Sequence, residues 1–148
     1  MSEIRELYQE MILDHNKSPR NFREMSDATQ QVNGFNPLCG DKLVVYLKVK
    51  DGAVEDVSFQ GTGCAISQAS ASMMTETVKG KSESEAKKLF EGFHAMLSGK
   101  SEADPEALGK LVVFHGVNEY PARVKCATLA WHTLKTALDG KDEETSTE

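Results

Sequence analysis

The chain has 148 residues, 39% of them hydrophobic, and a formal net charge of -6 at pH 7, which favours a single domain and argues against nucleic acid as a partner. A domain of this size buries about 70% of its unfolded surface, so we expect it to fold without help from a metal. The polar N-terminus and the lack of about 18 consecutive apolar residues predict a cytoplasmic protein with no secretory signal and no membrane contact.

The first half of the chain predicts a helix followed by antiparallel strands. Apolar residues recur at helical spacing near the N-terminus until Ser18 and Pro19 break the pattern. Alternating apolar residues then predict a strand, and Asp51 with Gly52 is typical of a hairpin turn. The expected elements are a helix over 2–16, an extended segment over 31–35, and paired strands over 43–49 and 54–60.

The second half of the chain predicts helices. Gly80 ends the first of them, and Ser82 with Glu85 forms a capping box for the next. Pro121 suits the first position of the last helix. The expected helices run from Cys64 to Lys79, from Ser82 to Leu97, from Asp104 toward Phe114, and from Pro121 to Leu138. This order of elements predicts an α+β domain with its helices gathered on one face of the sheet.

Neither an internal repeat nor a linker divides the sequence, so we expect one domain over residues 1–139. The remaining residues, 140–148, contain one lysine and four acidic residues and carry a net charge of -3. A short, strongly charged segment with no apolar residues cannot bury enough surface to order itself. We therefore expect residues 140–148 to form an acidic disordered tail.

Three cysteines, Cys39, Cys64 and Cys126, carry most of the functional argument. An odd number of cysteines in a chain expected in the cytoplasm argues against a disulfide framework and leaves the thiols for metal binding or sulfur chemistry. Asp41 follows Cys39 by two residues, so both side chains can converge on one ion. Together the four residues provide the number of ligands that a closed tetrahedral zinc site needs.

Each cysteine lies in a setting that favours its exposure or its thiolate form. Cys39 lies in a predicted loop, where it can be presented at the surface and can move. Cys64 begins a predicted helix, whose free amide groups stabilise a thiolate. Cys126 lies near Arg123 and Lys125, and these positive neighbours are expected to lower the pKa of its thiol.

The spacing alone leaves other interpretations open. Free cysteines are often buried as small apolar residues, and the gaps of 25 and 62 residues between these three match no short zinc-finger pattern. The four histidines are scattered, and only His115, in a segment that contains glycine, stands out as a candidate ligand. None of the cysteines has a recognisable histidine and acid pair, which argues against a cysteine hydrolase.

Four segments of the chain form a recognisable set in a fixed order. They are Met11–Asn21, Asn36–Asp41, Gly61–Ser67 and Ala122–Trp131. With these segments the chain resembles the U-type iron-sulfur assembly proteins, and the resemblance covers nearly everything from the first predicted helix to Leu138. It implies a compact α+β domain with a small antiparallel three-stranded sheet and helices packed on it.

Three features place the resemblance in the SufU-type branch of that family. In the scaffold branch a histidine directly precedes the last cysteine, whereas Lys125 stands there in this chain. The Leu-Pro-Pro-Val-Lys chaperone-docking motif of the scaffold branch is absent, and residues 119–123 read Glu-Tyr-Pro-Ala-Arg in its place. The segment over residues 99–116 resembles the insertion that is typical of SufU-type proteins.

The resemblance to this branch implies a zinc-dependent sulfurtransferase. The implied zinc ligands are Cys39, Asp41, Cys64 and Cys126. Cys39 would accept persulfide sulfur from a pyridoxal-phosphate cysteine desulfurase, and downstream iron-sulfur assembly proteins would receive it. Arg123 is the candidate contact to the desulfurase. The alternatives are a non-enzymatic scaffold that builds an iron-sulfur cluster on the same residues, and a structural zinc module that only binds a partner.

Overall fold

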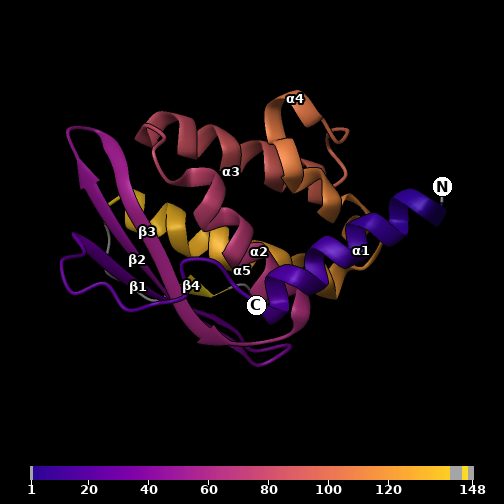
Figure 1. The fold of residues 1–148 in the computed structure, drawn as a ribbon, viewed down its shortest axis with the longest axis horizontal. Coiled ribbons are helices and arrows are strands. Elements are labelled where there is room, and N and C mark those ends of the chain that lie inside the picture. The colour runs from indigo at the N-terminus through magenta and orange to yellow at the C-terminus, as the bar shows by residue number, and fades with distance from the viewer. Residues whose placement is uncertain (1, 141–144, 147–148) are drawn as a thin grey trace.

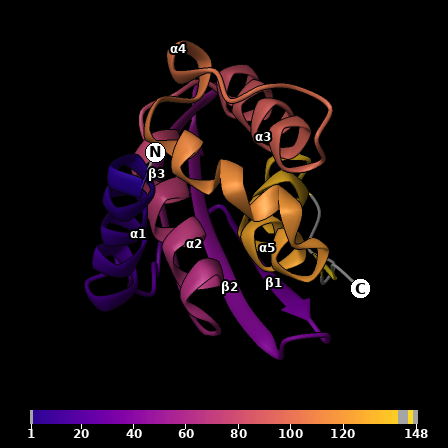
Figure 2. The same ribbon diagram turned by 90° about the vertical axis from the view of Figure 1, so that its right-hand side faces the viewer.

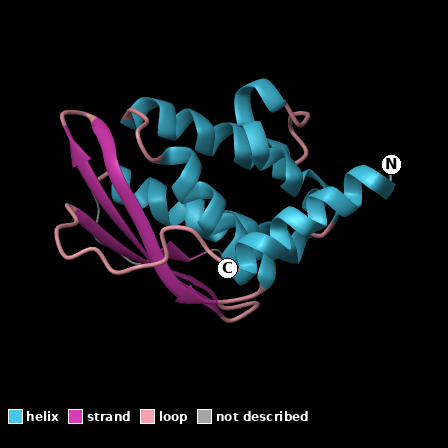
Figure 3. Cartoon of the chain, in the orientation of Figure 1, coloured by secondary structure: helices cyan, strands magenta, loops and turns pink. Residues whose placement is uncertain are grey.

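A computed structural model describes residues 2–140 and 145–146 and places the sheet on one side of the molecule and the helices on the other (Figure 1, Figure 3). The helices are α1 (Ser2–Lys17), α2 (Ala65–Val78), α3 (Glu83–Leu97), α4 (Pro105–Leu108), the 3-10 helix η1 (Gly109–Glu119) and α5 (Pro121–Leu138). The strands are β1 (Gln30–Asn36), β2 (Asp41–Lys50), β3 (Ala53–Thr62) and β4 (Thr145–Ser146). The predicted α+β fold with helices on one face of the sheet is confirmed.

The sheet is built from three consecutive antiparallel strands, as predicted. Alternation along β2 buries Leu43, Val45 and Leu47 on the helix-facing side. Asp51 and Gly52 connect β2 to β3 with φ angles of 54° and 76°, and positive φ at both central residues is the geometry of a type I′ hairpin turn. The described part of the sheet has the order β3-β2-β1-β4, in which β4 adds to β1 in parallel.

The predicted acidic tail stays a prediction. Residues 141–144 and 147–148 of that tail lie outside the described residues. Within the tail, the structure describes Gly140, which follows α5 with φ 73°, and β4, which pairs with Gly34 and Phe35 of β1. The predicted domain boundary at residue 139 coincides with the residue that caps α5.

The predicted helix boundaries are largely confirmed, with one correction. Ser82 and Glu85 form the capping box at the start of α3, and Pro121 is in the first turn of α5. The helix expected from Asp104 toward Phe114 is α-helical only as far as α4, and the chain continues as η1. Gly109 has φ 57°, which interrupts the α-helix at this point. Across the described ranges, no helix has the length and apolar character needed to cross a membrane.

The helices form two layers over the sheet. α5 packs on β1 and β2, α2 packs on β3, and α1, α3 and η1 cover these two helices (Figure 2). α5 is buried on several sides: Trp131 stacks on Phe93 of α3 with ring centroids 5.0 Å apart, and Thr133 faces β1. A Cβ atom at Gly34 of β1 would lie 2.2 Å from Thr133 Oγ1, so glycine permits this close approach. The early turns of this central helix hold Cys126 in place.

Candidate metal site

The candidate site lies where the β1–β2 turn, the start of α2 and the first turns of α5 meet. Cys39 lies in the turn before β2, and Asp41 is the first residue of β2. Cys64 is the N-cap residue of α2, and Cys126 lies in α5. The fold therefore brings together residues that are up to 87 positions apart in the sequence.

The side chains of three predicted ligands converge. One ligand atom from each of Cys39, Asp41 and Cys126 lies within 4.8 Å of the other two, and the two Sγ atoms are 3.3 Å apart. Two thiolates on one tetrahedral zinc ion lie about 3.8 Å apart, given Zn–S bonds of about 2.3 Å. Cys64 falls outside this group of three but lies beside it, because its Sγ interacts with the Cys126 thiol. His115 is exposed on η1 and is not a member of the group.

The Asp41 carboxylate is fully buried and held by two N–H donors. The backbone N–H of Cys64 donates to Oδ1 at 2.9 Å, and the Asn36 side-chain amide donates to Oδ2 at 3.1 Å. Gly63 leaves room for the carboxylate, because a Cβ atom there would lie 2.6 Å from Asp41 Oδ1. A carboxylate has about four acceptor positions, so two of them remain for a cation.

The three thiols differ sharply in exposure. Cys39 is exposed, Cys64 is half-buried, and Cys126 is fully buried. The helix amide expected at Cys64 is the N–H of Ser67, which donates to its Sγ at 3.5 Å. Thus the site has one edge that is open to solvent and a floor that is closed.

The prediction that Arg123 and Lys125 lower the pKa of Cys126 is wrong. Burial raises the pKa of the Cys126 thiol, and hydrogen bonds with Cys39 and Asp41 raise it further. The sequence places two cations near this cysteine, but α5 is a central helix and its Cys126 side chain faces the interior. A bound cation would reverse this effect, since a coordinating thiol loses its proton outright.

Exposed side chains flank the site residues along the chain. The guanidinium of Arg123 lies near the three cysteine side chains, and its interactions with Cys64, Cys126 and Cys39 raise the pKa of Arg123. Leu38 and Tyr120 are the most exposed large hydrophobic side chains in the part of the chain with described burial, at 61% and 60%. These two residues lie next to Cys39 and at the start of α5 respectively.

Sequence reasoning missed the buried polar residues that support the site. Asn36 is fully buried at the end of β1, and its amide contacts both Asp41 and Cys126. The only local sequence feature that pointed to a role for Asn36 was its position directly before Pro37, inside a recognised segment. Gly63 also lies inside a recognised segment, and the structure shows the steric reason for a glycine there.

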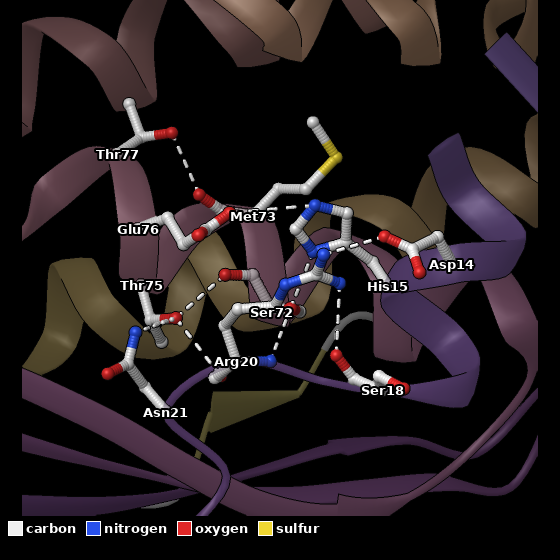
Figure 4. Close-up of polar contacts among 10 residues, drawn as sticks. All are labelled: Asp14, His15, Ser18, Arg20, Asn21, Ser72, Met73, Thr75, Glu76 and Thr77. Atoms are coloured by element: carbon white, nitrogen blue, oxygen red, sulfur yellow. Dashed lines mark hydrogen bonds and ion pairs between the residues drawn. The ribbon is translucent and has the colours of Figure 1, made fainter. Parts of the chain in front are cut away.

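The Met11–Asn21 segment, whose role the sequence left open, fixes α1 on α2 through polar contacts (Figure 4). His15 is buried, and its Nδ1 is 2.7 Å from Ser72 Oγ, which also accepts the backbone N–H of Arg20 at 2.8 Å. The Asn21 side chain donates to Thr75 Oγ1 at 3.0 Å. Burial lowers the pKa of His15, so the imidazole is favoured in its neutral form. The segment thereby anchors the helix whose N-cap is Cys64.

Comparison with known protein families identifies the domain. The family described as the NifU-like N terminal domain matches residues 7–138. This chain belongs to that family. The match spans every element from α1 to α5 that positions the NifU-like site, and it confirms the predicted relation to U-type iron-sulfur assembly proteins.

Relatives of this NifU-like chain carry two kinds of name. The zinc-dependent sulfurtransferase SufU of Bacillus subtilis is 43% identical over 132 residues, which cover 89% of each chain. The iron-sulfur cluster assembly scaffold protein IscU of Thermotoga maritima is 44% identical over 132 residues, which cover 89% of this chain and 92% of the relative. A crystal structure described as an iron-sulfur cluster assembly scaffold protein for the SUF system, from Fervidobacterium islandicum, superposes with a TM-score of 0.83 at 38% identity, covering 87% of this chain and 94% of that one.

Proposed function

We propose that this chain is a zinc-dependent sulfurtransferase that accepts persulfide sulfur from a pyridoxal-phosphate cysteine desulfurase for iron-sulfur cluster assembly. The observation that carries the proposal is the contrast between two neighbouring thiols: Cys39 is exposed, and Cys126, 3.3 Å away, is fully buried. A structural zinc module has no use for a reactive thiol at its surface, whereas a sulfur acceptor requires one. The name of the Bacillus subtilis relative supports the same activity.

The donor set suits zinc. We assign Cys39, Asp41, Cys64 and Cys126 as the ligands, which gives three sulfur atoms and one carboxylate oxygen in the number that zinc prefers. Zinc, when bound, supplies positive charge that keeps the thiols deprotonated, and it neither oxidises nor reduces them. The protein contributes the buried floor, in which Asp41 and Cys126 are held by hydrogen bonds.

Cys39 is the proposed acceptor. Its thiolate attacks the outer sulfur of the donor's persulfide, so that a sulfur-sulfur bond forms on Cys39 while the donor's sulfur-sulfur bond breaks. The electron pair of the broken bond leaves with the donor cysteine as a thiolate, so the transfer needs neither oxidant nor reductant. A second protein can reach Cys39 because it is exposed, whereas it cannot reach Cys126 in the folded chain.

The exposed rim suits a protein partner. Leu38, the chain neighbour of the acceptor, and Tyr120, at the start of α5, offer exposed apolar and aromatic contact area, and aromatic residues with arginine are the side chains that dominate binding energy at interfaces. Arg123 adds a cation close to the thiols, where it would attract the negatively charged persulfide. We therefore assign Arg123 as a contact to the desulfurase. The three free cysteines fit the reducing cytoplasm, where we place the protein.

The proposal is tested by purifying the protein without added metal, measuring its metal content, and mixing it with a cysteine desulfurase and cysteine. One zinc per chain, a faster release of sulfide in the presence of a reductant, and a persulfide mapped to Cys39 by mass spectrometry are expected. Cys39→Ser should keep the fold, as checked by thermal unfolding, and lose the stimulation. Unchanged stimulation by that variant would contradict the assignment of the acceptor.

A cluster scaffold is the second candidate function, favoured by the scaffold name of the Thermotoga maritima relative. The same three thiols and carboxylate suit an iron-sulfur cluster, because thiolates bind both cargoes. The two functions differ in what the purified protein contains. A brown protein with iron and acid-labile sulfide would favour the scaffold, and a colourless zinc protein that accelerates a desulfurase would favour the sulfurtransferase.

A further inference from the structure

Asn36 occupies a central position beneath the candidate metal site. Its side chain is fully buried at the last position of β1. The Nδ2 group donates to Asp41 Oδ2 at 3.1 Å and lies 3.6 Å from Cys126 Sγ. The Oδ1 atom accepts the backbone N–H of Leu38 at 3.3 Å. One carboxamide therefore touches two of the candidate ligands and the start of the loop that carries Cys39.

The four candidate ligands are supported unequally. Asp41 has a donor on each carboxylate oxygen, and Cys126 is held between the Asn36 amide and the backbone of its own helix. The Cys64 thiol accepts the N–H of Ser67 at the start of α2. Among the described residues, Cys39 Sγ has one hydrogen-bond partner, the Cys126 thiol, and it is the exposed member of the set.

We propose that Asn36 is a positioning residue that holds Asp41 and Cys126 as the fixed side of the metal site. This inference rests on the proposed function, because it assumes that the group binds a metal. The two N–H bonds of the Asn36 amide match the two acceptors that face it, a carboxylate and a sulfur. Hydrogen bonds of this kind orient metal ligands, and their loss typically weakens metal binding.

The chemistry of asparagine explains why this residue is needed. An aspartate at position 36 would have nearly the same shape and would still accept the Leu38 N–H, but it would present a carboxylate to Asp41 in place of a donor. Two buried carboxylates side by side repel each other. An alanine would remove the donor without adding charge and would leave one oxygen of the buried Asp41 without its partner.

The experiment compares the metal-loaded wild type with Asn36→Asp, Asn36→Ala and the control Asn33→Asp. Asn33 is exposed on the same strand, three residues earlier, so its substitution makes the same chemical change away from the site. Zinc affinity is measured by competition with a chromogenic chelator. We expect both Asn36 variants to bind zinc roughly 10- to 100-fold more weakly, as is typical when a residue behind a metal ligand is removed, and the control to match the wild type.

Two further readouts separate positioning from a general loss of structure. With cobalt in place of zinc, the thiolate-to-metal absorption should keep its shape in the control and change in both Asn36 variants, because the Cys126 thiolate is no longer held. In the metal-loaded wild type, an alkylating reagent should label Cys39 first and leave Cys126 unlabelled. In the Asn36 variants, labelling should extend to Cys126.

The outcomes distinguish this inference from the proposed function. Zinc affinity, cobalt spectrum and labelling pattern that are the same in Asn36→Ala and the wild type would overturn the role of Asn36, whatever Asn36→Asp does. None of these readouts needs a desulfurase. If the wild type failed to accept sulfur while the Asn36 variants still lost metal affinity and Cys126 protection, the proposed function would fall and the positioning role would stand.

Discussion

Gly63→Ala tests how tightly the site is built around Asp41. The new Cβ atom would lie 2.6 Å from Asp41 Oδ1, about 0.8 Å short of ordinary contact at 3.4 Å, and 3.2 Å from both Cβ and Cγ of the same residue. The carboxylate cannot swing into solvent, because it is fully buried and held by the N–H of Cys64 and the amide of Asn36. A shift of this size breaks the 2.9 Å bond from Cys64.

The loss of one hydrogen bond to a charged group costs about 1.5–3 kcal/mol. If the whole of this cost reduces the free energy of metal binding, zinc affinity should fall roughly tenfold to hundredfold. Chelator competition gives the affinity, and urea unfolding of the metal-free protein reports any change in the free energy of unfolding. Gly116→Ala is the matched control, because a Cβ atom at Gly116 meets nothing within 4 Å. Equal zinc affinity in Gly63→Ala and Gly116→Ala would refute the view that Asp41 is held rigidly for a metal.

The remaining predictions concern stability. Burial lowers the pKa of His15 and of His132 from 6.5, so the unfolded chain binds more protons in acid, and the free energy of unfolding should fall as the pH drops below 6.5. Urea titrations at several pH values should show a shallower fall for His15→Gln. Ser82→Ala removes the capping box of α3 and should lower the free energy of unfolding by about 1 kcal/mol, read by chemical denaturation. Gly34→Ala forces a Cβ atom against Thr133 and should lower the free energy of unfolding by about 1–3 kcal/mol. The double variant with Thr133→Ala should recover part of this loss. Full stability of the single variant would show that α5 can shift.

The sequence predicted those features of the fold that short patterns encode. The hairpin at Asp51 and Gly52, the capping box at Ser82 and the placement of Cys64 at a helix start all depend on residues that are close together in the chain. The α-helix predicted beyond Asp104 was too long, because a single positive φ at Gly109 outweighs the apolar pattern that follows it.

Other features depend on tertiary packing and left little trace in local sequence. The contact between Asn36 and Cys126 joins residues 90 positions apart, so no window of the sequence contains both. The pKa of the Cys126 thiol was predicted in the wrong direction, because its charged neighbours are visible in the sequence whereas the burial of α5 is not. The sequence predicted which residues are the candidate ligands, but only the structure shows that hydrogen bonds hold these ligands unequally.

The wide separation of the site residues along the chain has a consequence for how the protein is made. A chain grows from its N-terminus, and its domain folds as the segments it needs become available. Cys39, Asp41 and Cys64 emerge long before Cys126, which lies on the last α-helix and is among the final residues of the domain. A nascent chain therefore exposes an incomplete set of thiols until the last helix of the domain has been made. The complete site is a product of the finished domain, and no excised loop or hairpin of this chain can reproduce it.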